Sequence, residues 1–153
     1  MGNGSRRRFG KFYESQVDKI LGILDIQFKP GQISSDTYLD ICEQKGIAPD
    51  PNEMPPTLGS YPYEVQVAFL LHDLLPDRWD GASGSYFGKD MSALGTLLDV
   101  YDVKDKKTTV YFIKIIEGKR SKLLNDKLAK DRKQAKNQAK AGSMQASGIN
   151  IKG

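Results

Sequence analysis

The sequence predicts a mainly α-helical protein: a small domain of about four to five helices, with a Pro-rich strap and a long basic helix or tail at its C-terminus. Three observations lead to this prediction. Apolar residues recur at three- and four-residue spacing in several windows, which is typical of amphipathic helices. Five of the seven prolines fall within the fourteen residues 49–62. Residues 119–153 are rich in lysine, alanine and glutamine and contain ten cations.

The first predicted helix ends near residue 28. Its apolar positions follow the helical period: Val17, Ile20, Leu21, Leu24 and Phe28. Pro30 cannot continue the hydrogen-bond ladder, and Gly31 tolerates the turn that follows. A second helix opens at Ser34 or Ser35, either of which can cap it, and stops at Gly46.

The second helix is expected to place Tyr38, Leu39 and Cys42 on one side. Cys42 is the single cysteine, so no intramolecular disulfide can form, and we interpret it as a small buried apolar residue. One cysteine and one histidine, His72, cannot complete a zinc shell without carboxylates. No metal site and no cofactor are therefore expected.

The prolines after this helix predict an extended segment, because such a stretch prefers polyproline-like conformations. They are Pro49, Pro51, Pro55, Pro56 and Pro62. We interpret the segment as a stiff strap that crosses the surface of the domain; recruitment of a proline-reading partner is the alternative. Pro62 suits the first turn of a third helix, which Pro76 closes.

The third helix has an inner stripe formed by Val65, Ala68, Phe69, His72 and Leu75. Residues 77–90 then read as a Gly-rich loop. A fourth helix is predicted from about Met91, with Leu94, Leu97, Leu98 and Tyr101 as its apolar positions.

Residues 108–116 are ambiguous, because their Thr, Val, Tyr, Phe and Ile content favours a strand while the sequence that follows favours a helix. Since no other convincing strand is available for pairing, we predict a helix that continues to about Ala141. The last third of this helix has no apolar face and should be solvated.

The net charge of +4 conceals three regions. Residues 1–11 carry four cations and no acid, and residues 119–153 carry ten cations and two acids, which leaves residues 12–118 at −8. We therefore divide the chain into a basic N-terminal arm (1–11), a helical domain (12–118) and a basic C-terminal extension (119–153). No run approaches the roughly 18 apolar residues of a membrane span, so no membrane role is expected.

The Gly-rich loop invites a phosphate-binding interpretation because of Gly88 and Lys89. The segment from Gly84 to Asp90 is one residue shorter than a P-loop and has Asp90 where the Mg²⁺-binding hydroxyl belongs, so nucleotide binding is rejected. The loop's aromatic residues either dock onto the core or anchor a partner. They are Trp79, Tyr86 and Phe87.

Catalysis is not expected. His72 is the one candidate general base, and nothing in the sequence marks a nucleophile aimed at it with a third group to orient it. The acids Asp77, Asp80 and Asp90 do not match a calcium-binding loop. We accordingly name no catalytic residue.

The basic extension offers the remaining candidate contacts. Candidate partner-binding residues are Trp79, Tyr86, Phe87, Lys89, Arg120, Lys127, Lys130, Arg132 and Lys133. Nucleic-acid attachment through counterion release is one interpretation, although the extension contains no aromatic residue for base stacking. Docking to an acidic protein surface is the other, and the acidic body of a second copy would serve, giving a homo-oligomer.

Three segments in the middle of the chain resemble small morphogenesis proteins of tailed bacteriophages, of the tail assembly chaperone type. They are CEQKGIAPDP (42–51), YPYEVQVAF (61–69) and LPDRWDGASGSYFGKDMSAL (75–94), and the resemblance covers about residues 42–116. It implies a small, helical, non-enzymatic adaptor that binds other phage structural or tail proteins. It also implies a location in the host cytoplasm during assembly or in the virion. A nucleic-acid-associated accessory protein that uses its basic tails is the alternative function.

Overall fold

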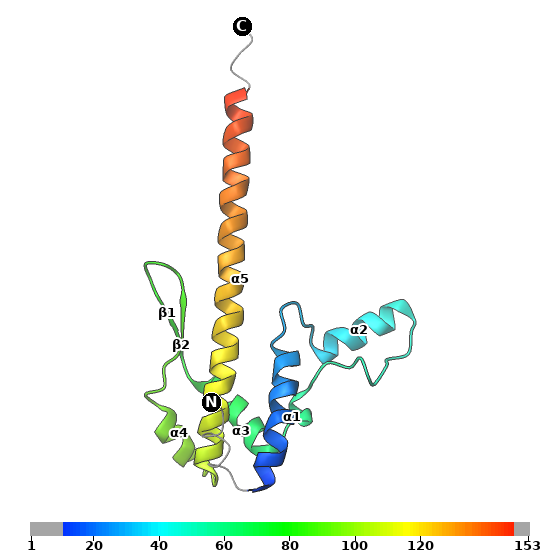
Figure 1. The fold of residues 1–153 in the computed structure, drawn as a ribbon, viewed down its shortest axis with the longest axis vertical. Helices are drawn as coiled ribbons and strands as arrows, with labels where there is room; N and C mark the ends of the chain where they lie inside the picture. Colours follow the sequence, from blue (N-terminus) through cyan, green and yellow to red (C-terminus); the bar gives the residue numbers. More distant parts are fainter. Residues whose placement is uncertain (1–10, 149–153) are drawn as a thin grey trace.

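The computed structural model describes the backbone of residues 11–148 and the side chains of residues 16–147. In this part of the chain, five α-helices and one short hairpin confirm the predicted mainly helical fold (Figure 1). The helices are α1 (Lys11–Gln27), α2 (Ser35–Lys45), α3 (Tyr63–Leu74), α4 (Leu94–Val100) and α5 (Lys106–Gly148). Most of the predicted N-terminal arm and the last five residues of the predicted extension lie outside the described residues.

The core forms where α1, α3 and α4 meet the first part of α5. Its buried members are Ile20, Leu24, Tyr61, Val65, Ala68, Leu71, Leu98, Phe112, Ile113 and Ile116. The α5 members are spaced so that they share one helical face, which is why residues 108–116 form a helix despite their strand-favouring composition. Asp105 caps this helix by accepting from the Thr108 N–H at 3.1 Å. The prediction of a helix over 108–116 is therefore confirmed.

Helix α2 begins and ends as the sequence predicts. The Ser34 hydroxyl accepts from the Thr37 N–H at 3.1 Å, and Gly46 closes the helix with a positive φ of 64°. Cys42 is buried and free. Leu39 was expected beside it but is exposed, because α2 projects to one side of the body (Figure 1) and has little to pack against.

The Pro-rich residues form an extended connection between α2 and a short 3₁₀ helix, η2 (Leu58–Ser60). The connection returns beside α2, since the Tyr38 hydroxyl accepts from the Asp50 N–H at 3.1 Å. Pro62 is then the N-cap of α3.

Three helical predictions need correction. The buried stripe of α3 includes Leu71, which the predicted stripe omits. Helix α4 begins at Leu94 rather than Met91, because Asp90 accepts from the Ser92 N–H and holds a turn before it. Tyr101, expected on the inner face, is exposed at the end of α4.

The segment 77–90 is a β-hairpin, so its prediction as a loop is wrong. Strands β1 (Asp77–Trp79) and β2 (Tyr86–Lys89) pair antiparallel. The register places Asp77 opposite Lys89 and Trp79 opposite Tyr86, which leaves Phe87 as the extra residue of a bulge. Strands this short have too few residues to show alternation in the sequence.

Helix α5 has 43 residues and is therefore about 65 Å long. Its first part lies in the core, and it then continues away from the body as a single rod (Figure 1). The predicted extension is thus a continuous helix through Gly148, seven residues beyond the expected end at Ala141. Every residue from 129 to 147 is exposed. This confirms the prediction that the last third of the helix is solvated. Within residues 11–148, no helix is long and apolar enough to cross a membrane.

Candidate functional site

The hairpin is fixed to α5 by a partly buried polar cluster centred on Asp77. Its carboxylate accepts from Lys89 Nζ at 3.0 Å, from the Tyr86 hydroxyl at 3.0 Å and from the Arg120 guanidinium at 3.1 Å. The Arg120 guanidinium also lies over the Tyr86 ring, 5.4 Å from its centroid. This cluster brings three of the predicted partner-binding residues, Lys89, Tyr86 and Arg120, onto one aspartate.

The cluster shifts the pKa values of Asp77 and Tyr86. Partial burial of Asp77 opposes its charged form, but hydrogen bonds from Lys89 and Tyr86 and the charge of Arg120 outweigh it and lower the pKa of Asp77. Burial, together with the hydrogen bond to Asp77, raises the pKa of the Tyr86 phenol. Asp77 therefore stays ionised and Tyr86 stays neutral at neutral pH.

Glu117 of α5 forms a second junction. One carboxylate oxygen accepts from the Lys89 N–H at 3.1 Å and from the Ser121 hydroxyl at 2.8 Å, and the other lies 2.5 Å from His72 Nε2. Gly88, with φ of 95°, allows the hairpin to approach this carboxylate. A Cβ at position 88 would lie 2.5 Å from the Glu117 oxygen, so glycine is required here.

Two further residues extend the junction along α5. The Asn125 amide accepts from the Tyr86 N–H and donates to the Tyr86 carbonyl, both at 3.0 Å, as a neighbouring strand would. Arg132 donates to the Ser83 carbonyl near the tip of the hairpin. The hairpin therefore lies along α5 from Glu117 to Arg132.

The predicted aromatic residues separate into buried and exposed groups. Tyr86 and Lys89 are both buried against α5. These two side chains therefore pack between the hairpin and the helix. Trp79 and Phe87 are 51% and 62% exposed. Trp79 keeps an edge-to-face contact with Tyr86, with ring centroids 5.0 Å apart. The hairpin thus offers two large aromatic surfaces to the outside.

The predicted cations of α5 do not share one face. Arg132 faces the hairpin, and Lys130, two residues earlier, lies on nearly the opposite side of the helix. Lys127 is exposed near the Lys130 side of the helix, and Lys133 is exposed about 100° around the helix from Arg132. The hairpin-facing side instead continues through Lys136 and Lys140, which follow Arg132 at four-residue steps.

His72 is 1% exposed. In a Ser–His–acid triad, the serine faces the imidazole and the acid lies behind it. Here the Glu117 carboxylate lies between His72 and Ser121, so these three residues are not ordered for nucleophilic attack. We interpret His72 as a hydrogen-bonded core residue that helps to hold Glu117.

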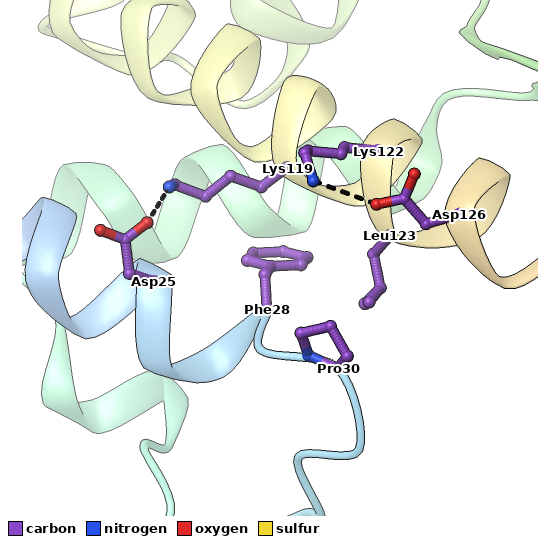
Figure 2. Close-up of a pocket in the computed structure, with 7 residues that line it drawn as sticks. All are labelled: Asp25, Phe28, Pro30, Lys119, Lys122, Leu123 and Asp126. Atoms are coloured by element: carbon purple, nitrogen blue, oxygen red, sulfur yellow. Dashed lines mark hydrogen bonds and ion pairs between the residues drawn. The ribbon is translucent and has the colours of Figure 1, made fainter.

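A small pocket lies on another side of α5, where the end of α1 approaches it (Figure 2). It has a volume of about 140 Å³. Lys119 is paired with Asp25, and Lys122 is paired with Asp126 at 3.0 Å. Lys119 and Lys122 are the cations that line the pocket. Because both are already paired with aspartates of the same chain, the pocket offers little positive charge to an anionic ligand.

Sequence reasoning missed Asp77, Glu117 and Asn125 as members of the site. Glu117, Ser121 and Asn125 recur at four-residue spacing, which places them on one helical face. This four-residue spacing is visible in the sequence, but it lies within a lysine-rich stretch. It predicts a contact only when a hairpin is already known to lie beside this face of α5.

Among residues 16–147, no group of three or more His, Cys, Asp or Glu side chains is placed to hold a metal ion. Comparisons with protein-family models, with curated proteins and with solved structures give no match.

Proposed function

We propose that this chain is a non-enzymatic adaptor that binds other proteins during assembly of a larger structure, of the kind that the resemblance to bacteriophage tail assembly chaperones implies. The observation that carries the proposal is the distal part of α5. Residues 133–147 are exposed on every side and contribute nothing to the core of the body. Folding of the body does not explain a helix of this length, whereas contact with a partner does.

The contact face combines aromatic and basic groups. The exposed Trp79 and Phe87 of the hairpin lie beside α5, and Arg132, Lys136 and Lys140 continue the same side of the helix. Aromatic anchors surrounded by charged residues are common where proteins bind one another. The expected partner therefore presents an apolar pocket next to acidic residues.

A photo-crosslinking amino acid in the full chain, expressed in its natural host, tests this face. We would place it in turn at Phe87 and at Lys136, with Lys130 on the opposite side of α5 and exposed Thr96 of α4 as matched controls. The expected result is that the first two positions crosslink to the same protein and the controls do so far less. Equal crosslinking yields at all four positions would refute the proposal that this face binds the partner.

Nucleic-acid association is the second candidate, favoured by the charge of α5. Residues 129–147 hold five cations and one acid. Each phosphate neutralised would contribute about −0.9 to the slope of log affinity against log salt concentration for duplex DNA. Anisotropy of a labelled duplex, titrated at several salt concentrations, measures that slope.

The matched variant for this titration is Lys130→Gln/Lys133→Gln/Lys136→Gln/Lys140→Gln, which keeps the helix because glutamine is also a good helix former. A truncation at Gly118 is unsuitable, since it would remove Arg120 and Asn125 from the hairpin junction. Steep salt-dependent binding that the variant loses would favour the second candidate over the adaptor. No binding at physiological salt would exclude it.

A further inference from the structure

Helix α3 is apolar on two faces, and only one of them lies in the core. Its inner face is buried through Val65, Ala68 and Leu71. Tyr63, Val67, Leu70 and Leu74 follow one another at helical spacing on the other side. Tyr63 is 75% exposed and Leu70 is 45% exposed. Val67 packs partly against the core, so the uncovered part of this outer face consists of Tyr63, Leu70 and Leu74. An exposed apolar patch of this kind is typical of a surface that binds a partner.

The outer face of α3 forms one wall of a groove with a volume of about 320 Å³. The connection between α4 and α5 forms the other wall, with Tyr101 and Val103 as its apolar members. The remaining lining is largely acidic, because Glu64, Asp102 and Asp105 outnumber Lys104. We call this the α3 groove; its chemistry suits an apolar segment that carries positive charge and no acid.

The C-terminal segment of this chain has that chemistry. Residues 144–152 contain one cation, Lys152, and no acid, and four further cations precede them after the last acid, Asp131. Met144, the last large apolar residue of α5, is 74% exposed, and Ile149 and Ile151 follow it in the sequence. We call residues 144–152 the tail segment.

The tail segment cannot reach the groove of its own chain. Thr109, at the groove, and Met144 lie 35 residues apart on one continuous helix, which separates them by about 52 Å. The five residues after Gly148 extend at most about 17 Å. Figure 1 shows the two ends of α5 at opposite ends of the molecule.

We propose that the α3 groove binds the tail segment of a second copy of this chain. The contact joins two different surfaces, so it is heterologous, and each added copy leaves a free groove at one end and a free tail at the other. Association therefore grows with concentration rather than stopping at a dimer. This inference does not depend on the partner proposed above.

Sedimentation velocity of the full chain, from micromolar to near-millimolar concentration and at low and high salt, tests the proposal. The groove variant is Tyr63→Gln/Leu70→Gln, and the tail variant is Met144→Ser/Ile149→Ser/Ile151→Ser. The control is Leu39→Gln/Ile47→Gln, which changes two exposed apolar residues on and beside α2. All the substituted residues that the structure describes are exposed, so folding should be retained, and Trp79 fluorescence checks this.

The wild type and the control should show a mass that rises with concentration and falls with salt. The groove and tail variants should each associate at least roughly tenfold more weakly, because large apolar side chains are lost from the contact. Mixed together, they should form a complex of two chains and nothing larger, since one intact groove and one intact tail remain.

Three results would overturn the proposal: a wild type that stays monomeric at the highest concentration, a control that loses as much association as the two variants, or a mixture that forms no complex. The last result would show that any self-association uses a different, symmetric surface.

Discussion

Replacing Gly88 with alanine tests how the hairpin is held on α5. Position 88 has φ of 95°, and a Cβ there would lie 2.5 Å from the Glu117 carboxylate. Backbone strain of this kind costs about 1–3 kcal/mol. Displacing Glu117 also breaks its hydrogen bond with the buried Lys89 N–H, which costs about 1–3 kcal/mol more. Gly88→Ala should therefore lower the free energy of unfolding by roughly 2–6 kcal/mol.

Urea unfolding followed by fluorescence is a suitable assay, because Trp79 is the single tryptophan and lies in the hairpin. The two contributions separate in a double-mutant cycle with Glu117→Ala. In that background the steric conflict is absent, so Gly88→Ala should cost only the backbone strain. Equal costs in both backgrounds would refute the steric part of the reasoning, and an unchanged midpoint in the single variant would refute all of it.

Gly118→Ala is the matched control for the same assay. Gly118 lies next to Glu117 in α5, and a Cβ there meets nothing within 4 Å. Because glycine is a poor residue inside a helix, this substitution should raise the free energy of unfolding by about 1 kcal/mol. A loss would indicate that the helix surface at this point is covered.

Three further predictions concern single side chains. Asp102 has a positive φ of 47°, so Asp102→Gly should raise the free energy of unfolding by about 1 kcal/mol in a urea titration; a loss would show that its side chain is needed. The lowered pKa of Asp77 implies stability that is present above the ordinary pKa of about 4 and is lost as pH falls through the lower value. Asp77→Asn should therefore have a lower melting temperature at neutral pH and a flatter decline in acid, and parallel acid limbs would contradict this. Burial raises the pKa of Tyr61 to about 12. Stability should therefore decline between pH 10 and 12 in the wild type and less so in Tyr61→Phe; equal declines in melts over that range would contradict it.

Local sequence signals predicted those parts of the fold that local interactions decide. Ser34 and Gly46 carry side-chain and backbone properties that fix the two ends of α2, so its bounds followed from the sequence. The helix over residues 108–116 was harder, because its residues favour a strand. The helix prediction rested on the helix-favouring sequence that follows and on the lack of another convincing strand in the sequence.

The parts that depend on distant contacts were not predictable. The hairpin needs Asn125 and Glu117, which lie 28 to 39 residues away from the strand residues that they bind. The sequence of residues 77–90 contains no local pattern that indicates these partners. For the same reason the sequence identified Tyr86 and Lys89 as interesting side chains but could not show that both are buried against α5, whereas Trp79 and Phe87 are exposed.

The continuity of α5 has a geometric consequence. An unbroken helix fixes both the distance and the rotational angle of its far end relative to the body. A partner that binds at Met144 is therefore held at a defined distance and angle. Deleting one residue between Arg132 and Met144 would shorten the rod by about 1.5 Å and turn its far end by about 100°. Deleting seven would shorten it by about 10 Å yet return the far end to within about 20° of its original angle. The two deletions therefore distinguish a partner that senses the reach of α5 from one that senses its orientation.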